Sequence, residues 1–173
     1  RDISIAKNKY KRAFIYNFTL FLFFINLKGL KAIQEINLTI IGTGQQKILN
    51  NIYFHDRPSQ LLVNGIVQSS ADYYVYNLTQ NINLITIRWD YNLTTCDSMF
   101  YKLENIIDFD FSNFDTSQVS DMDSMFRNVK SLKILDLRHF NTSSVKTMVR
   151  MFIGCTSLVS LNLNNFDTSQ VSN

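Results

Sequence analysis

The sequence predicts an α/β protein in which a 26-residue repeat stacks along one axis, preceded by a small antiparallel β unit. Two observations predict this class. Apolar residues return at one fixed offset through the second half of the chain. Within each repeat, they recur first at every second position, as in a strand, and then at every third or fourth position, as in a helix. The segment before the repeats instead alternates short apolar runs with turn residues, which is typical of hairpins. With 173 residues, 46% of them hydrophobic, the chain is long enough to bury a core of this kind.

Residues 1–32 predict a secretory signal peptide. A basic cluster, Lys7–Arg12, leads into the apolar run 13–25, and Ala32 offers a small residue for cleavage. An uncleaved signal anchor and a buried core helix are the alternatives, and Asn17 weakens the anchor by interrupting the apolar run. Because the chain lacks an initiating methionine and stops inside a repeat, we interpret it as part of a longer protein.

Charge argues against a nucleic-acid partner. The formal net charge of +3 arises in residues 1–32, which hold seven Lys and Arg residues against one Asp. Residues 33–173 then hold ten basic and thirteen acidic residues, a net charge of −3. A body of that sign repels phosphate, so we expect no binding of nucleic acid.

Residues 33–92 predict a β-rich N-terminal cap. The pair Asn64-Gly65 is a strong hairpin signal, and Gly42-Thr43-Gly44 marks another turn. A small antiparallel unit here would cover the open end of the repeat stack, which needs a polar outer surface. The runs that predict strands are 36–41, 47–49, 60–63, 73–78 and 83–89.

Residues 93–173 predict leucine-rich repeats that are truncated at the C-terminus. In one repeat, Leu132, Leu135 and Leu137 have the L-x-x-L-x-L spacing of a leucine-rich-repeat strand. The stripe from Val145 through Met148 and Met151 to Phe152 then predicts a short helix. Positions that return at the 26-residue period include Met99, Met125 and Met151; Phe100, Phe126 and Phe152; Phe114, Phe140 and Phe166; and Val119, Val145 and Val171.

One strand-turn-helix unit cannot hide its apolar side alone, so neighbouring repeats must stack and place equivalent side chains on each other. A fully buried Phe or Leu contributes about 1.5–3 kcal/mol, enough for such ladders to dominate the stability. The sequence therefore predicts a leucine-rich-repeat solenoid.

The repeat motifs resemble those of the BspA-like leucine-rich-repeat surface proteins, in the Mycoplasma-type repeat subclass. The strings that carry this resemblance are Met125-Phe126, Leu135-Asp136-Leu137, Met151-Phe152-Ile153-Gly154-Cys155-Thr156-Ser157-Leu158 and Asn165-Phe166-Asp167-Thr168-Ser169-Gln170-Val171. The resemblance covers residues 93–173 and implies extracellular display, with a role in adhesion or partner contact. Ligands of such proteins are mostly undefined.

The outward positions of the predicted strands form a candidate recognition face. Adjacent strands lie about 4.8 Å apart, so these residues should make rows across the repeats. An ordinary solvated sheet face is the alternative interpretation. The residues are Asp108, Asp110 and Ser112; Ile134, Asp136 and Arg138; and Ser160, Asn162 and Asn164.

Other candidate chemistry is sparse. If the chain is secreted by a eukaryote, four sequons are acceptors for N-glycosylation, at Asn37, Asn77, Asn92 and Asn141. Two scattered cysteines, Cys96 and Cys155, are expected to be unpaired and buried. His55 and His139 are expected to be polar surface residues rather than catalytic ones. We expect no catalytic residues, no metal site and no cofactor.

These observations predict a non-catalytic extracellular protein, secreted or at the cell surface, that mediates adhesion or recognition of a protein or glycan on a cell or matrix. A structural spacer or fibre-forming surface protein without a specific ligand is the alternative. Contact with a membrane is expected only through a signal anchor or a C-terminal anchor beyond residue 173. Because the outward residues differ between repeats, the sequence favours the binding role.

Overall fold

The computed structural model describes residues 33–68 and 76–172, and these residues form an all-β structure with nine strands and no helix. The predicted α/β leucine-rich-repeat solenoid is therefore wrong: the described residues contain no helical layer, and the largest sheet is antiparallel. The predicted signal segment 1–32 lies outside the described residues.

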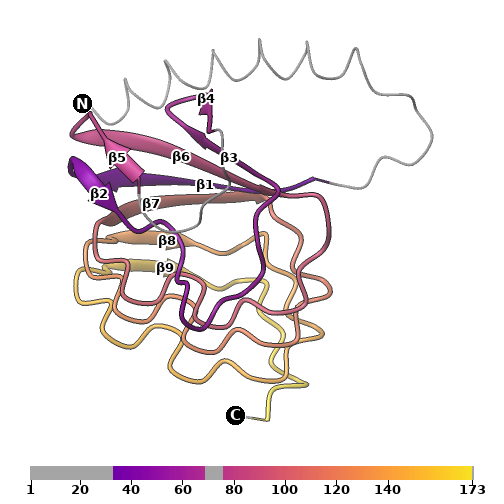
Figure 1. Ribbon diagram of the computed structural model, residues 1–173. Helices are drawn as coiled ribbons and strands as arrows, with labels where there is room; N and C mark the ends of the chain where they lie inside the picture. Colours follow the sequence, from indigo (N-terminus) through magenta and orange to yellow (C-terminus); the bar gives the residue numbers. More distant parts are fainter. Residues whose placement is uncertain (1–32, 69–75, 173) are drawn as a thin grey trace.

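Five strands make the main sheet, in the order β4-β3-β6-β1-β7 (Figure 1). Strands β1 and β6 pair along their whole lengths, with Gln34 opposite Trp89 at one end and Ile41 opposite Ile82 at the other. Every neighbouring pair in this sheet is antiparallel. The strands are β1 (Gln34–Ile41), β3 (Gln60–Val63), β4 (Ile66–Val67), β6 (Ile82–Trp89) and β7 (Ile106–Asn113); β2 (Gly44–Gln46) and β5 (Tyr76–Leu78) form a separate pair.

The N-terminal half largely follows the strand predictions. The run 60–63 is β3, and the runs 36–41 and 83–89 lie within β1 and β6. The hairpin turn between β3 and β4 is confirmed, since Asn64 and Gly65 both have positive φ, at 51° and 81°, as a type I′ turn requires. The run 47–49 is not a strand.

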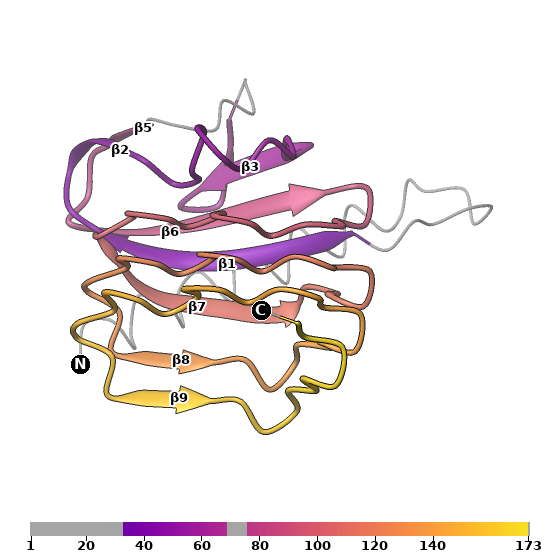
Figure 2. The same ribbon diagram turned by 90° about the horizontal axis from the view of Figure 1, so that it is seen from below.

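Strands of successive repeats lie side by side. β8 (Ile134–Asp136) and β9 (Ser160–Asn162) pair in parallel, with Leu135 opposite Leu161. Both views show β7, β8 and β9 in succession, so the separate two-stranded sheet of β8 and β9 lies next to β7 at the edge of the main sheet (Figure 2). The predicted equivalence of positions one repeat apart is thus confirmed for these strands.

The chain returns beneath the sheet between successive strands, and the returning stretches stack as well (Figure 1). We call residues 94–104, 120–130 and 146–156 the return segments. Parallel bridges join Thr95 to Asp121 and Asp121 to Thr147, again at the 26-residue offset. Neighbouring return segments are also joined by backbone hydrogen bonds, such as Phe100 N–H to the Met125 carbonyl at 3.0 Å and Phe126 N–H to the Met151 carbonyl at 3.1 Å.

The short helix predicted through Val145, Met148, Met151 and Phe152 is wrong, because the return segments are chains of turns. Some of their amides bond to a neighbouring repeat, as Phe126 does to Met151, and others bond to the carbonyl three residues earlier, as Met151 does to Met148, rather than to the carbonyl four residues earlier as in an α-helix. Residues in the left-handed region recur at matching positions and interrupt any helix. One set is Ser98, Ser124 and Arg150, with φ of 54°, 52° and 59°, and the other is Lys102, Asn128 and Gly154, with φ of 60°, 60° and 77°.

A single core fills the space between the sheet and the return segments, and it runs from Ile36 in β1 to Met151 in the last repeat. Two aromatic ladders pass through it. The rings of Phe100, Phe126 and Phe152 follow each other at centroid distances of 5.8 and 5.9 Å. The rings of Phe114, Phe140 and Phe166 do so at 6.2 and 6.4 Å.

Candidate recognition face

The nine predicted face residues come from three neighbouring strands and the residues just after them. β7 carries Asp108, Asp110 and Ser112; β8 carries Ile134 and Asp136, with Arg138 two residues later; β9 carries Ser160 and Asn162, with Asn164 two residues later. Asp108, Asp136 and Asn162 are half-buried, and the other six are exposed. We call this set the strand face.

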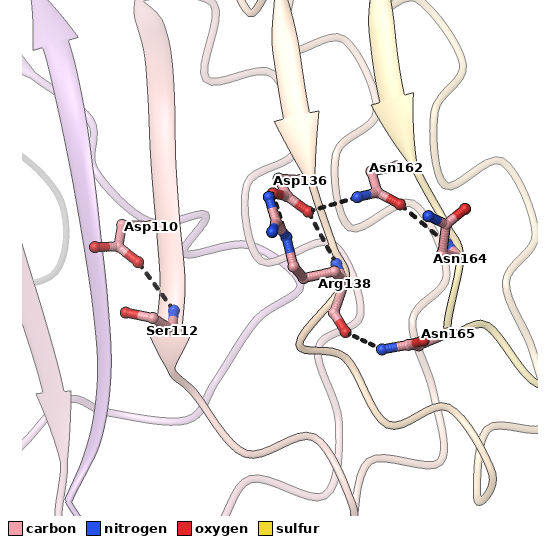
Figure 3. A network of polar contacts seen from close by, with 7 residues as sticks. All are labelled: Asp110, Ser112, Asp136, Arg138, Asn162, Asn164 and Asn165. Carbon is pink, nitrogen blue, oxygen red and sulfur yellow. Dashed lines mark hydrogen bonds and ion pairs between the residues drawn. The ribbon is translucent and has the colours of Figure 1, made fainter.

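One position on the strand face has the same local structure in every repeat (Figure 3). The side-chain Oδ1 of Asp110 accepts a hydrogen bond from the backbone N–H of Ser112 at 3.0 Å, and Asp136 accepts one from Arg138 at 3.1 Å. Asn162 does the same with Asn164 at 3.1 Å. A short Asp or Asn side chain suits this turn, so part of the recurrent polar character of the row is structural.

Asp136 is the most connected residue of the strand face (Figure 3). Its Oδ2 accepts a hydrogen bond from Arg138 Nε at 2.7 Å and a second from Nη2 of the same guanidinium. Its Oδ1 also accepts a hydrogen bond from Asn162 Nδ2 at 3.2 Å, which links β8 to β9. The hydrogen bonds from Arg138 hold the pKa of Asp136 below its ordinary value, and Asp136 in turn raises the pKa of Arg138.

The strand face continues a polar surface that the sequence argument missed. Asn37 in β1 pairs with Asp110, and Thr39 pairs with Asp108, so their side chains share one side of the sheet. On β1 this surface is a hydrogen-bonded network: Thr86 Oγ1 donates to Asn37 Oδ1 at 2.6 Å, and Asn37 Nδ2 donates to Glu35 at 3.0 Å. The alternation of polar residues within 34–41 and 82–89 could have predicted this part of the polar surface from the sequence.

Burial separates the two parts of this polar surface. Glu35 is buried and forms an ion pair with Arg88, whose Nε lies 2.7 Å from Glu35 Oε2. Thr39 and Thr86 are buried as well. The accessible part of the polar surface therefore lies on the repeats, over β7, β8 and β9.

The four predicted sequons lie in different settings. Asn37 is in a central strand, with its amide engaged by Thr86 and Glu35. Asn92 accepts a hydrogen bond from Gln34 Nε2 at 3.1 Å.

The other two sequons lie elsewhere. Asn77 lies in β5, and its side chain is outside the described part of the chain. Asn141 is exposed, and its Oδ1 accepts the backbone N–H of Ser143 at 3.1 Å. Among the sequons with described side chains, Asn141 is the most accessible.

Both cysteines are free, as predicted, but only Cys96 is fully buried. Cys155 is half-buried, and its thiol lies 3.0 Å from the carbonyl of Phe126. Burial raises the pKa of both thiols, which disfavours the reactive thiolate. His55 and His139 are both exposed.

No group of three or more His, Cys, Asp or Glu side chains within residues 33–68 and 76–172 is arranged to hold a metal ion. Over the same residues, no helix has the length and apolar character needed to cross a bilayer. What the described residues offer is an exposed polar surface over β7, β8 and β9.

Comparison with known proteins adds one finding. Searches of curated proteins and of solved structures gave no match. The sequence pattern of one family matches residues 71–173, which is more than half of the chain and includes every repeat. This match is consistent with the Mycoplasma-type resemblance of the repeat motifs. The chain belongs to the family described as "Mycoplasma protein of unknown function, DUF285".

Proposed function

We propose that this protein is a non-catalytic extracellular interaction module, which uses the strand face to recognise a protein or glycan on a cell surface or matrix. The observation that carries the proposal is a constant scaffold with a variable surface. Ring and backbone contacts recur at every 26-residue step, while the outward residues change from Asp-Asp-Ser to Ile-Asp-Arg to Ser-Asn-Asn.

The composition of the strand face supports a binding role. Ile134 is 61% exposed and stands beside the exposed Arg138 ion pair, so β8 combines an apolar contact with a charged one. Exposed ion pairs contribute little to folding stability, and arginine is enriched where proteins make energetic contacts. A surface that served only as a spacer would gain nothing from this combination.

Secretion is the part of the proposal that rests on the basic-then-apolar segment 1–32. Adhesion by the intact protein therefore requires that this segment directs export. The rival function is a structural spacer or fibre-forming surface protein. This rival function is favoured if the outward residues can be made the same in every repeat without any loss of binding.

A triple variant tests the proposal while preserving the fold. Ile134→Ser, Asp136→Asn and Arg138→Asn together copy the face of β9 onto β8. The structure already accommodates these residues at the equivalent positions, and Asn162 shows that Asn still closes the turn. Binding of the full chain would be measured on surfaces coated with collagen, laminin or heparan sulfate.

A contact through β8 predicts that the triple variant binds roughly tenfold or more weakly, since a few residues dominate such interfaces. Gln118→Ser copies Ser144 at an exposed turn position after β7, outside the strand face, and should leave binding unchanged. Equal binding by the triple variant and the unmodified chain, or no binding by either, would favour the spacer.

A further inference from the structure

The loop between β2 and β3 runs alongside the first return segment and presents an aromatic side chain there (Figure 1). Asn50 anchors this loop: its backbone N–H donates to the Met99 carbonyl at 2.9 Å, and its Nδ2 donates to the Tyr101 carbonyl at 3.2 Å. Asn50 Oδ1 accepts the backbone N–H of Tyr53 at 3.1 Å, which closes a turn. Tyr53 therefore has a fixed place beside the repeats, although it is 53% exposed.

Tyr53 packs against Tyr101, and two cations lie close to the Tyr101 ring. The two tyrosine ring centroids are 5.9 Å apart, and the ring planes are inclined by 59°. Lys102 Nζ lies 5.1 Å from the Tyr101 centroid, and Arg127 Cζ lies 5.4 Å from it. Arg127 has the position in the second return segment that Tyr101 has in the first, so the stacking of the repeats sets this arrangement. We call Tyr53, Tyr101, Lys102 and Arg127 the return-side cluster.

The two cations of the return-side cluster have no acidic partner in the described part of the chain. Neither Lys102 nor Arg127 forms an ion pair within residues 33–68 and 76–172. Arg127 Nε is also buried, and it makes no hydrogen bond to any of these residues. Because buried donors are nearly always paired, an open one calls for an acceptor. Both positive charges are therefore available to an anionic ligand.

The backbone beneath the return-side cluster is already hydrogen-bonded. The N–H of Tyr101 donates to the Ser98 carbonyl at 3.0 Å, and the N–H of Lys102 donates to the Arg127 carbonyl at 2.9 Å. The Tyr101 carbonyl accepts from Asn50. An extended peptide that adds to a sheet edge binds through free backbone groups, and it would find its partners occupied here. Recognition must therefore use the exposed ring and the two cations.

A sugar ring that carries a carboxylate or a sulfate matches these features. The C–H groups of a sugar are weakly positive and pack on the negative face of an aromatic ring, and Tyr53 is exposed enough to offer one. An anionic group on the same sugar would accept from Arg127, and such charge-assisted hydrogen bonds are about twice as strong as neutral ones. A nucleic acid also carries rings and anions, but the net negative charge of residues 33–173 repels a long polyanion.

We propose that the return-side cluster is a binding site for an acidic sugar, separate from the strand face. Tyr53 stacks on the sugar ring, while Arg127 and Lys102 hold its carboxylate or sulfate. Tyr101 positions both cations through its ring. No residue of the return-side cluster belongs to β7, β8 or β9, so each surface can be occupied independently of the other.

The test is isothermal titration calorimetry of the full chain with two acidic probes, sialyllactose and a sulfated disaccharide from heparin. Comparing them distinguishes a carboxylate ligand from a sulfate ligand, and lactose is the uncharged control. The proposal predicts that at least one acidic probe binds, and that lactose binds roughly tenfold more weakly or worse because it lacks the charged contact. Added salt should weaken binding of the acidic probe, since it screens exposed charges.

Substitutions separate the roles of the charge and the ring. Arg127→Gln removes one cation and should weaken binding of the acidic probe roughly tenfold or more, with lactose binding unchanged. Tyr53→Ser removes an exposed ring and should weaken binding of both sugars, whereas Tyr53→Phe keeps the ring and should retain it. Lys133→Gln removes an exposed cation outside the return-side cluster and is the matched control, which should bind the acidic probe like the unmodified chain.

Several outcomes would overturn the proposal. One is that neither acidic probe binds, and another is that Arg127→Gln and Tyr53→Ser both bind like the unmodified chain. Loss of binding in the triple variant of β8 would place the sugar on the strand face instead. Tighter binding of a polyglutamate peptide than of either acidic probe would assign the return-side cluster to a protein partner.

Discussion

Thr116 and Asn141 exchange two hydrogen bonds across the boundary between repeats: Thr116 Oγ1 donates to the Asn141 carbonyl at 2.9 Å and accepts the Asn141 N–H at 2.8 Å. Thr142 and Asp167 repeat the arrangement one step later, at 2.9 and 2.7 Å. Thr116 is fully buried. A single hydroxyl therefore satisfies both backbone groups of the following repeat.

We expect Thr116→Val to destabilise the protein by about 1–3 kcal/mol, because it leaves a buried N–H and a carbonyl without partners. Urea denaturation would measure the change in the free energy of unfolding. Thr168→Val is the matched control, because Thr168 is exposed and should tolerate the change within about 0.5 kcal/mol. Equal losses for the two variants would contradict a specific role for the Thr116 hydroxyl.

Gly154 predicts a second, steric effect. Its φ is +77°, and a Cβ atom there would lie 1.9 Å from Asn128 Oδ1. Gly44 has nearly the same φ, +76°, with nothing within 4 Å of its Cβ position. Gly44→Ala should therefore cost about 1–2 kcal/mol for the left-handed backbone alone, and Gly154→Ala roughly 1–3 kcal/mol more for the clash.

Thermal or urea unfolding of both alanine variants measures the difference. Adding Asn128→Gly to Gly154→Ala removes the obstructing side chain at a position that already has positive φ. The double variant should then approach the stability of Gly44→Ala. If Asn128→Gly brings no recovery, the clash is not the cause.

Asp136 gives a prediction about pH. Its pKa is lowered chiefly by hydrogen bonds from the Arg138 side chain. Because the folded-state pKa lies below the unfolded one, the group adds stability above the ordinary carboxyl pKa and loses it as the pH falls through the folded value. Arg138→Ala should raise the pKa of Asp136 towards its ordinary range.

An NMR titration of the side-chain carboxyl carbons would follow this change. Asp167 is the internal control, since its pKa is lowered by Ser169 and should not respond to Arg138→Ala. An unshifted Asp136 in the variant would mean that another group sets its pKa.

The sequence alone located the repeat and its strands correctly but assigned the wrong structure to the return segments. The spacing of Val145, Met148, Met151 and Phe152 imitates a helical stripe because a chain of tight turns also brings an apolar side chain inward every three or four residues. Periodicity reports which side chains face the core. It does not report whether an amide bonds within its own repeat or to the next one.

A signal for the correct structure was nevertheless present. Asn128 and Gly154 occupy the same place in successive repeats, and both residue types tolerate positive φ. Two such residues one repeat apart argue for a recurrent turn rather than a helix. Part of the candidate site was predictable too, since the outward rows over β7–β9 follow from strand alternation, whereas burial of Glu35 and Thr39 depends on tertiary packing that alternation does not encode.

Backbone hydrogen bonds between the return segments recur at the 26-residue offset, from Cys96 to Asp121 and again from Met122 to Thr147. Each repeat therefore meets its neighbour through the same set of contacts, so the number of repeats can change without a new kind of interface. Gene duplication can then change the length of the protein and the number of its exposed strand surfaces in steps of one repeat, without changing the contacts that stabilise each repeat.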